Sequence, residues 1–156
     1  MGCDIHVRIE CKVKGKGNQY KWYDCTPKYL NPFFGIEGEP KYESLCEFGR
    51  NHEAFELLQG KYNVLSNNGC PEDLSELVGQ ELKNAGSNIY GIGHFTLLEL
   101  KYFCLTSTEQ IAFDDDEKPL TAKDVLKQYI EIMQIVYNAS TAKNENCVRM
   151  VFWFDC

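Results

Sequence analysis

Apolar and polar residues alternate strictly along the first residues of the chain. One set holds Cys3, Ile5, Val7, Ile9, Cys11 and Val13, and the other holds Asp4, His6, Arg8 and Glu10. Successive side chains of a β-strand point to opposite faces, so residues 3–13 predict a strand with one apolar and one titratable face. A Gly-rich turn over 14–18 and renewed alternation over 19–24 predict a second strand and hence a hairpin.

Two helices are predicted in the middle of the chain from their end signals. Asn51 is placed to cap a short helix that ends at Gly60. Pro71 stands at the first position of a second helix, which Gly86 ends.

The second half of the chain predicts two more helices and a closing strand. Thr96 caps a helix through residue 103, and Thr121 opens the longest helix, over about 122–138. Residues 147–155 form a continuous run of branched and aromatic side chains, which is typical of a central strand buried on both faces.

Residues 26–49 and 87–94 show neither period and predict two irregular segments, the first long enough to lie over the domain as a lid. The order of elements predicts an α+β fold in one domain spanning 1–156. Its small, mostly antiparallel sheet combines the N-terminal hairpin with the C-terminal strand and is backed by several helices.

The charge balance argues against a nucleic-acid partner. The chain has 156 residues and a formal net charge of -7, whereas nucleic-acid binders carry a basic patch. Its nearest equivalent is Lys12, Lys14 and Lys16, which we interpret as a solvated hairpin tip. The acidic run 114–117 is interpreted as an exposed loop.

No apolar run is long enough for a membrane span and no signal peptide is recognisable, so we expect a cytoplasmic protein. The eight cysteines include no C-x-x-C pair, which argues against a zinc site. In a reducing compartment they are expected to be free thiols.

The titratable face of the first strand is the leading candidate site. Asp4, His6, Arg8 and Glu10 combine two acids, an imidazole and a guanidinium in one row. Such a row suits a ligand-binding surface, and it equally suits a solvated sheet face with mixed charges. The sequence leaves both interpretations open.

A second constellation resembles part of a two-metal phosphoesterase. Such enzymes hold two cations with a D-x-H strand, an N-H-[DE] segment and a later G-H element. The corresponding residues here are Asp4, His6, His52 and His94. The motif is incomplete, because no G-D-x-x-D element is present and His94 lacks a second histidine.

Two further sites have both a binding and a structural interpretation. Arg50 and Asn51 at a helix start suit an anion, and they equally suit a surface Arg beside a capping Asn. Trp153 and Arg149 share one face of the closing strand, where core packing is the alternative to a stacking surface.

Several of these pieces together resemble a family of small phage and prophage proteins without assigned function. The resembling pieces are Met1-Gly-Cys-Asp-Ile-His6, Lys21-Trp22, Arg50-Asn51, Gly69-Cys-Pro-Glu-Asp-Leu74 and Val148-Arg-Met-Val-Phe-Trp-Phe-Asp155. In that family the positions of His52 and His94 are typically Tyr and Trp. The resemblance therefore implies that a metal site would be peculiar to this chain.

The resemblance implies a phage accessory protein in a bacterial cytoplasm that binds rather than reacts. Our leading hypothesis is that it sequesters a nucleotide-like small molecule, such as a signal of bacterial immunity, without a cofactor. Arg8, Arg50 and Arg149 would meet phosphates, Trp22, Tyr90 or a loop aromatic would stack, and His6 and Asn51 would read polar edges.

Two alternatives stay open for the function. One is a phosphodiesterase or phosphoesterase that depends on a divalent metal. The other is an inhibitor of a host protein that uses residues 26–49 or 114–117 as its contact. The sequence also leaves open whether the chain forms a homo-oligomer.

Overall fold

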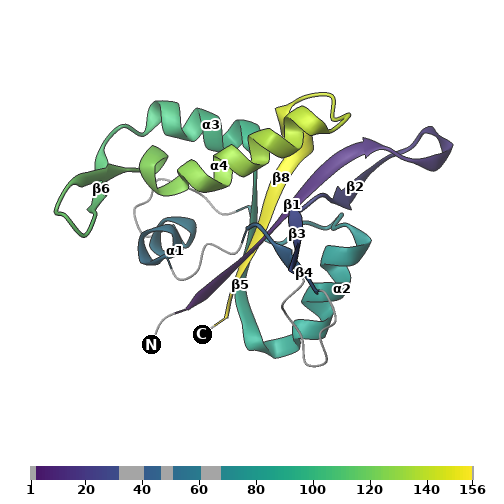
Figure 1. The fold of residues 1–156 in the computed structure, drawn as a ribbon, viewed down its shortest axis with the longest axis horizontal. Helices are drawn as coiled ribbons and strands as arrows, with labels where there is room; N and C mark the ends of the chain where they lie inside the picture. The colour runs from purple at the N-terminus through teal and green to yellow at the C-terminus, as the bar shows by residue number, and fades with distance from the viewer. Residues whose placement is uncertain (1–2, 32–40, 47–50, 61–67, 156) are drawn as a thin grey trace.

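The computed structural model of the chain describes residues 3–31, 41–46, 51–60 and 68–155, and a four-stranded sheet forms its centre (Figure 1). Strand β1 (Asp4–Lys14) turns back through the 3₁₀ turn η1 (Lys16–Asn18) into β2 (Tyr20–Asp24). Gly17 adopts a φ of 80° in this turn, a left-handed conformation that glycine tolerates without a steric penalty. The predicted hairpin is confirmed.

The sheet is antiparallel throughout, with the strand order β2-β1-β8-β5. The closing strand β8 (Val148–Asp155) lies between β1 and β5 (Ile89–Thr96). All residues of β8 before Asp155 are buried, which confirms the predicted central strand covered on both faces. The α+β prediction is confirmed with it.

Helices α1 (His52–Leu58), α3 (Leu97–Thr106) and α4 (Ala122–Ala139) cover one face of the sheet (Figure 1). They pack on the apolar, odd-numbered side chains of β1 and on alternate side chains of β8. The shared core includes Ile5, Val7, Ile9, Cys11, Met150, Phe152 and Phe154. The strict alternation of apolar and polar residues in the first strand therefore reflects the burial of one of its faces in this core.

The starts of these helices follow the predicted caps. Asn51 accepts from the Ala54 backbone N–H, and Thr96 begins a capping box with Glu99. Thr121 begins a second capping box, in which Asp124 replaces the more usual Glu.

Helix α2 (Glu76–Ala85) covers the opposite face of the sheet (Figure 1). Its Val78 packs against Val151 and Trp153 of β8 in a second, smaller core. This helix begins later than predicted from Pro71, because Ser75 is the residue that caps it, and its hydroxyl accepts from the Val78 N–H.

The prediction that residues 87–94 are irregular was wrong. They contribute the short turn η2 (Gly86–Asn88) and most of β5. The Gly residues that hid the strand serve a bulge, since the β5–β8 register shifts between Tyr90 and Gly93 and Gly91 has a φ of 65°.

Part of the predicted irregular stretch 26–49 forms strands. Strands β3 (Lys28–Asn31) and β4 (Lys41–Ser44) pair as a two-stranded ribbon, and the rest of that stretch includes 32–40 and 47–49, outside the described residues.

A small hairpin of β6 (Gln110–Phe113) and β7 (Pro119–Thr121) carries the acidic run 114–117 in its turn. The 3₁₀ turn η3 (Glu145–Cys147) leads into β8. Within the described residues, no helix has both the length and the apolar character to cross a bilayer.

The cysteines follow the expected thiol state with one exception. Cys11, Cys25, Cys46, Cys70, Cys104 and Cys147 are thiols outside any disulfide. Cys3 takes part in a disulfide, against the prediction of free thiols throughout.

Candidate functional site

The polar row of β1 lies beneath helix α2, so it is neither an open ligand surface nor a solvated face along most of its length. Arg8 Nε donates to Glu81 Oε2 of α2 at 2.9 Å, and the Arg8 guanidinium lies 5.4 Å from the centroid of the Trp153 ring. His6 stacks on the same ring with a centroid separation of 5.6 Å. Trp153 is 2% exposed and packs against Val78 of α2, so Arg8 and Trp153 both join α2 to the sheet.

Glu10 and Arg149 form the buried centre of a polar network on this face. Arg149 Nε donates to Glu10 Oε1 at 2.7 Å, and the Ser75 N–H donates to the other carboxylate oxygen at 2.6 Å. Arg149 also donates through Nη1 to Asp73 Oδ1 at 2.8 Å. Glu10 is 0% exposed and Arg149 is 4% exposed, so neither is offered to a ligand directly.

The other predicted ligand-binding residues have local roles or lie elsewhere. Asn51 Oδ1 accepts from the Ala54 N–H at 3.0 Å as the cap of α1. Tyr90 is partly exposed on β5, with its hydroxyl 3.3 Å from Cys3 Sγ. Asp4 is exposed at the start of β1, and Arg50 lies outside the described residues.

The structure does not bring the alternative metal ligands Asp4, His6, His52 and His94 together. His52 is exposed and lies 3.2 Å from Glu56 of its own helix, and His94 Nδ1 lies 2.7 Å from the Gly69 carbonyl oxygen. Among the described residues, no group of three or more His, Cys, Asp or Glu side chains is arranged to hold a metal ion.

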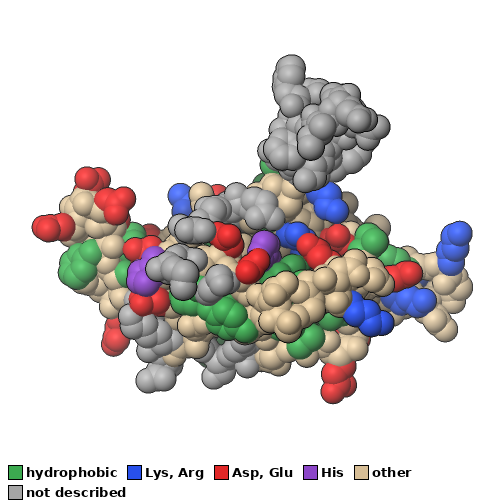
Figure 2. Space-filling model, turned by 90° about the horizontal axis from the view of Figure 1, so that it is seen from below, with side chains coloured by type: hydrophobic (Ala, Val, Ile, Leu, Met, Phe, Trp, Pro, Cys, Tyr) green, Lys and Arg blue, Asp and Glu red, His purple; other side chains and the backbone are tan. Residues whose placement is uncertain are grey.

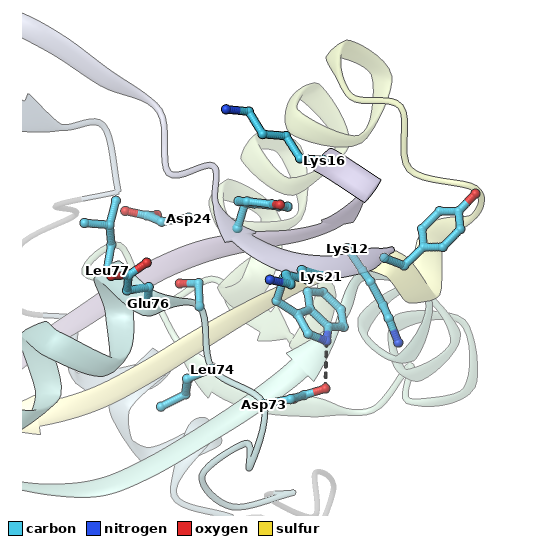
Figure 3. Close-up of a pocket in the computed structure, with 12 residues that line it drawn as sticks. Lys12, Lys16, Lys21, Asp24, Asp73, Leu74, Glu76 and Leu77 are labelled. Carbon is cyan, nitrogen blue, oxygen red and sulfur yellow. Dashed lines mark hydrogen bonds between the residues drawn. The ribbon is translucent and has the colours of Figure 1, made fainter. Parts of the chain in front are cut away.

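A pocket of about 850 Å³ lies between the β1–β2 hairpin and the segment that leads into α2 (Figure 3). The hairpin lines it with Lys12, Lys16, Tyr20, Lys21, Trp22, Tyr23 and Asp24. The opposite wall consists of Asp73, Leu74, Ser75, Glu76 and Leu77. The predicted binding residues of the β1 row do not line this pocket, although Glu10 reaches its wall through Ser75.

The acids of the pocket are largely engaged. Asp73 accepts from Arg149 and from Trp22 Nε1, the latter at 2.9 Å. Asp24 accepts from the Thr26 N–H at 3.1 Å and from the Thr26 hydroxyl. Glu76 is exposed and keeps an available charge at the pocket wall.

The lysines of the pocket, in contrast, are available. Lys12, Lys16 and Lys21 make no ion pair with any other described residue. Asp24 and Asp73 already accept from partners within the fold, whereas Lys12, Lys16 and Lys21 make no ion pair with described residues, so the pocket favours an anionic ligand.

Basic and acidic side chains gather at opposite ends of the molecule, with the basic ones on the side of the pocket. Figure 2 shows Lys and Arg side chains gathered at the end where the β1–β2 hairpin projects, and acidic side chains at the opposite end, which carries the β6–β7 hairpin. The net charge of -7 therefore coexists with a locally basic end.

Sequence reasoning missed this pocket because it treated the hairpin lysines as solvated. The available signal was the hairpin itself, whose register places Lys12 directly opposite Trp22. The position of the turn in the sequence fixes this register, so the pairing of a lysine with a tryptophan could have been found from the sequence. The second wall comes from residues some fifty positions later, and no local pattern predicts that they lie opposite.

Comparisons of the chain with models of known protein families, with curated proteins and with solved structures give no match.

Proposed function

We propose that this protein binds a nucleotide-like small molecule in the pocket between the β1–β2 hairpin and α2. The observation that carries the proposal is the combination of Lys12, Lys16 and Lys21, without ion pairs to described residues, with the Trp22 ring in one pocket of about 850 Å³. Nucleotides present the matching combination of phosphate anions and a planar base.

The size and chemistry of the pocket suit such a ligand. Small-molecule sites typically measure roughly 300–1,000 Å³ and combine apolar walls with a few polar groups. Lysine ammonium groups bind phosphates as flexible point charges, and aromatic faces stack on bases. Leu74 and Leu77 supply apolar surface on the wall opposite the hairpin.

The biological role that we propose is sequestration. The sequence contains no recognisable catalytic motif, and it resembles small phage proteins, for which removal of a nucleotide signal of bacterial immunity is a suitable task. A sequestering protein needs a pocket and tight binding, and it returns its ligand unchanged.

The test is a thermal-shift and calorimetric screen of the purified protein. The panel contains ATP, cyclic dinucleotides and cyclic ADP-ribose isomers, with chromatography of each nucleotide after incubation. A bound ligand raises the unfolding temperature by mass action. We expect at least one panel member to bind and to be recovered intact.

Matched variants locate the binding. Lys12→Ala and Lys21→Ala should each weaken binding by roughly fivefold to tenfold, since each removes a charged contact. Lys83→Ala is the control, because Lys83 is exposed in the last turn of α2 and does not line the pocket. Absence of binding across the panel, or equal losses in Lys83→Ala, contradicts the proposal. Consumption of the nucleotide would favour the phosphoesterase alternative.

A further inference from the structure

The indole of Trp22 is held in a fixed orientation at the pocket wall. Trp22 Nε1 donates to Asp73 Oδ2 at 2.9 Å, a bond drawn as a dashed line in Figure 3. The Arg149 guanidinium carbon lies 3.8 Å from the centroid of the Trp22 ring. Two contacts of different direction therefore restrict both the position and the tilt of the ring.

Arg149 is itself firmly held. Glu10 Oε1 lies 2.7 Å from its Nε and Asp73 Oδ1 lies 2.8 Å from its Nη1, and the side chain is 5% exposed. A cation that is paired on two sides and stacked on a ring has little freedom to move. The buried Glu10–Arg149 pair thus fixes the guanidinium against which the Trp22 ring packs.

The two faces of the Trp22 ring consequently differ. Arg149 occupies one face, and the residue still lines the pocket and is half-buried. An indole covered on one face by a paired guanidinium leaves its other face for a planar ligand group. Because the ring is already ordered, stacking on it costs little conformational entropy.

Lys12 lies directly opposite Trp22 in the β1–β2 register. Cys25 N–H donates to Ile9 O and Gly15 N–H donates to Gln19 O, so the odd-numbered residues of β2 face β1 with their hydrogen-bonding groups. Lys12 and Trp22 are therefore a non-hydrogen-bonded pair, the type in which opposite side chains approach more closely.

We propose that Trp22 is the stacking surface for the base of the ligand, with Lys12 at its phosphates and Arg149 as the positioning residue behind the ring. This inference rests on the proposed function and narrows the ligand class. The preferred ligand has both an unsaturated ring and an adjacent anionic group, so a bare polyphosphate or an uncharged nucleoside makes only part of these contacts and binds more weakly.

The test divides one probe into its parts. Dissociation constants are measured for ATP, adenosine and inorganic tripolyphosphate on the wild-type chain and on four variants, two at Trp22 and one each at Lys12 and Lys83. On the wild type we expect ATP to bind roughly tenfold or more tightly than tripolyphosphate, the size of effect that base stacking on an aromatic side chain gives.

The variants are expected to separate ring from charge. Trp22→Leu should remove the advantage of ATP over tripolyphosphate and leave tripolyphosphate binding unchanged, and Trp22→Phe should restore part of that advantage. Lys12→Ala should weaken ATP and tripolyphosphate by the same factor. Lys83→Ala should alter none of the values.

The positioning role of Arg149 has its own readout. Asp73→Asn removes an anionic partner of Arg149 and the carboxylate that holds Trp22, and Arg149→Met removes the cation itself. In a Trp153→Phe background Trp22 is the single tryptophan, since the chain contains two. We expect higher indole mobility by fluorescence anisotropy, a weaker ATP affinity and an unchanged tripolyphosphate affinity. Asp73→Asn provides the result should Arg149→Met fail to fold.

The outcomes distinguish the two proposals. Lysine-dependent binding with equal affinities for ATP and tripolyphosphate, or with no effect of Trp22→Leu, overturns the stacking inference and leaves the proposed function standing. An unchanged ATP affinity in Asp73→Asn and Arg149→Met overturns the positioning role. Failure of ATP and of every other panel nucleotide to bind overturns the proposed function together with this inference.

Discussion

Glu10 and Arg149 form a buried ion pair across neighbouring strands, with Arg149 Nε 2.7 Å from Glu10 Oε1. Glu10 has no exposed surface, and its second carboxylate oxygen accepts from the Ser75 N–H at the start of α2. One carboxylate therefore joins β1, β8 and the cap of the helix that covers them. A group this deeply buried tolerates its charge only because each oxygen has a partner.

Replacement of Glu10 should be strongly destabilising. Glu10→Gln leaves the Arg149 cation buried with only Asp73 as its anionic partner, and we expect a loss of about 3 kcal/mol in the free energy of unfolding. Urea denaturation followed by circular dichroism measures the loss. The control is Glu81→Gln, whose carboxylate pairs with Arg8 but is 39% exposed, and for which we expect at most about 1 kcal/mol. Equal losses in the two variants would contradict the special role of Glu10.

Replacement by alanine is expected to have opposite effects on stability at two glycines. Gly91 has a φ of 65°, and a Cβ there would lie 2.6 Å from the Phe154 ring, so Gly91→Ala should destabilise by about 2 kcal/mol or more. Gly79 lies within α2, and its added Cβ would meet only Leu74 at 3.9 Å. Gly79→Ala should therefore stabilise by about 0.5–1 kcal/mol, through the higher helix propensity of alanine.

Thermal unfolding of both variants beside the wild type checks the pair. The sign of each shift is the decisive result. A stable Gly91→Ala chain would show that the β5 bulge can relax away from Phe154.

Local patterns were sufficient for the elements whose signal lies within a few residues. The alternation of β1, the apolar run of β8 and the Thr121 capping box each report a period or a cap that the structure retains. The β5 strand was missed because its Gly residues, required for the bulge at Tyr90–Gly93, resemble a loop.

The candidate site could be predicted only in part, because its chemistry depends on which face of the sheet α2 covers. His6 and Arg8 look available in the sequence, but His6 stacks on the buried Trp153 ring of β8 and Arg8 pairs with Glu81 of α2. Lys12 continues the same row past the end of that cover and lines the pocket. Where a helix ends over a strand is a tertiary property that no local period encodes.

Asp73 should contribute to a pH dependence of stability in the acid range. Burial raises the pKa of its carboxyl, but the hydrogen bond and charge of Arg149 together with the Trp22 N–H outweigh this and hold the pKa below its ordinary value of 3.8. A carboxyl with a depressed folded pKa stabilises the fold above its unfolded pKa, and this contribution is lost as the pH falls through the folded pKa. We expect Asp73→Asn to be less stable than the wild type at about pH 6. Between pH 6 and pH 3 its free energy of unfolding should fall by less than that of the wild type.

Urea midpoints at several pH values measure this difference. Asp115→Asn is the control, because Asp115 is exposed in the β6–β7 turn. A wild-type and an Asp73→Asn curve that run parallel down to pH 3 would argue against the Arg149 contact as the cause.

Cys25 should be the most reactive free thiol near neutral pH among those of the described residues. A hydrogen bond from Cys11 lowers the pKa of Cys25 to about 7, against the opposing effect of burial. Burial raises the pKa of the half-buried Cys104 thiol instead, which makes Cys104 an internal comparison in the same molecule. Because the thiolate is the nucleophile, we expect Cys25 to react with iodoacetamide roughly tenfold faster than Cys104 at pH 7.5.

Peptide mass spectrometry after timed alkylation gives both rates, and their dependence on pH gives the titration midpoint of each thiol. Cys11→Ala removes the donor, so the Cys25 midpoint should rise and its rate at pH 7.5 should fall, while the Cys104 rate stays the same. A Cys25 midpoint near that of an ordinary thiol in the wild type would show that the Cys11 contact does not stabilise the thiolate. In that case the two cysteines are simply core residues of the hairpin, as the place of Cys11 among the buried apolar side chains of β1 already suggests.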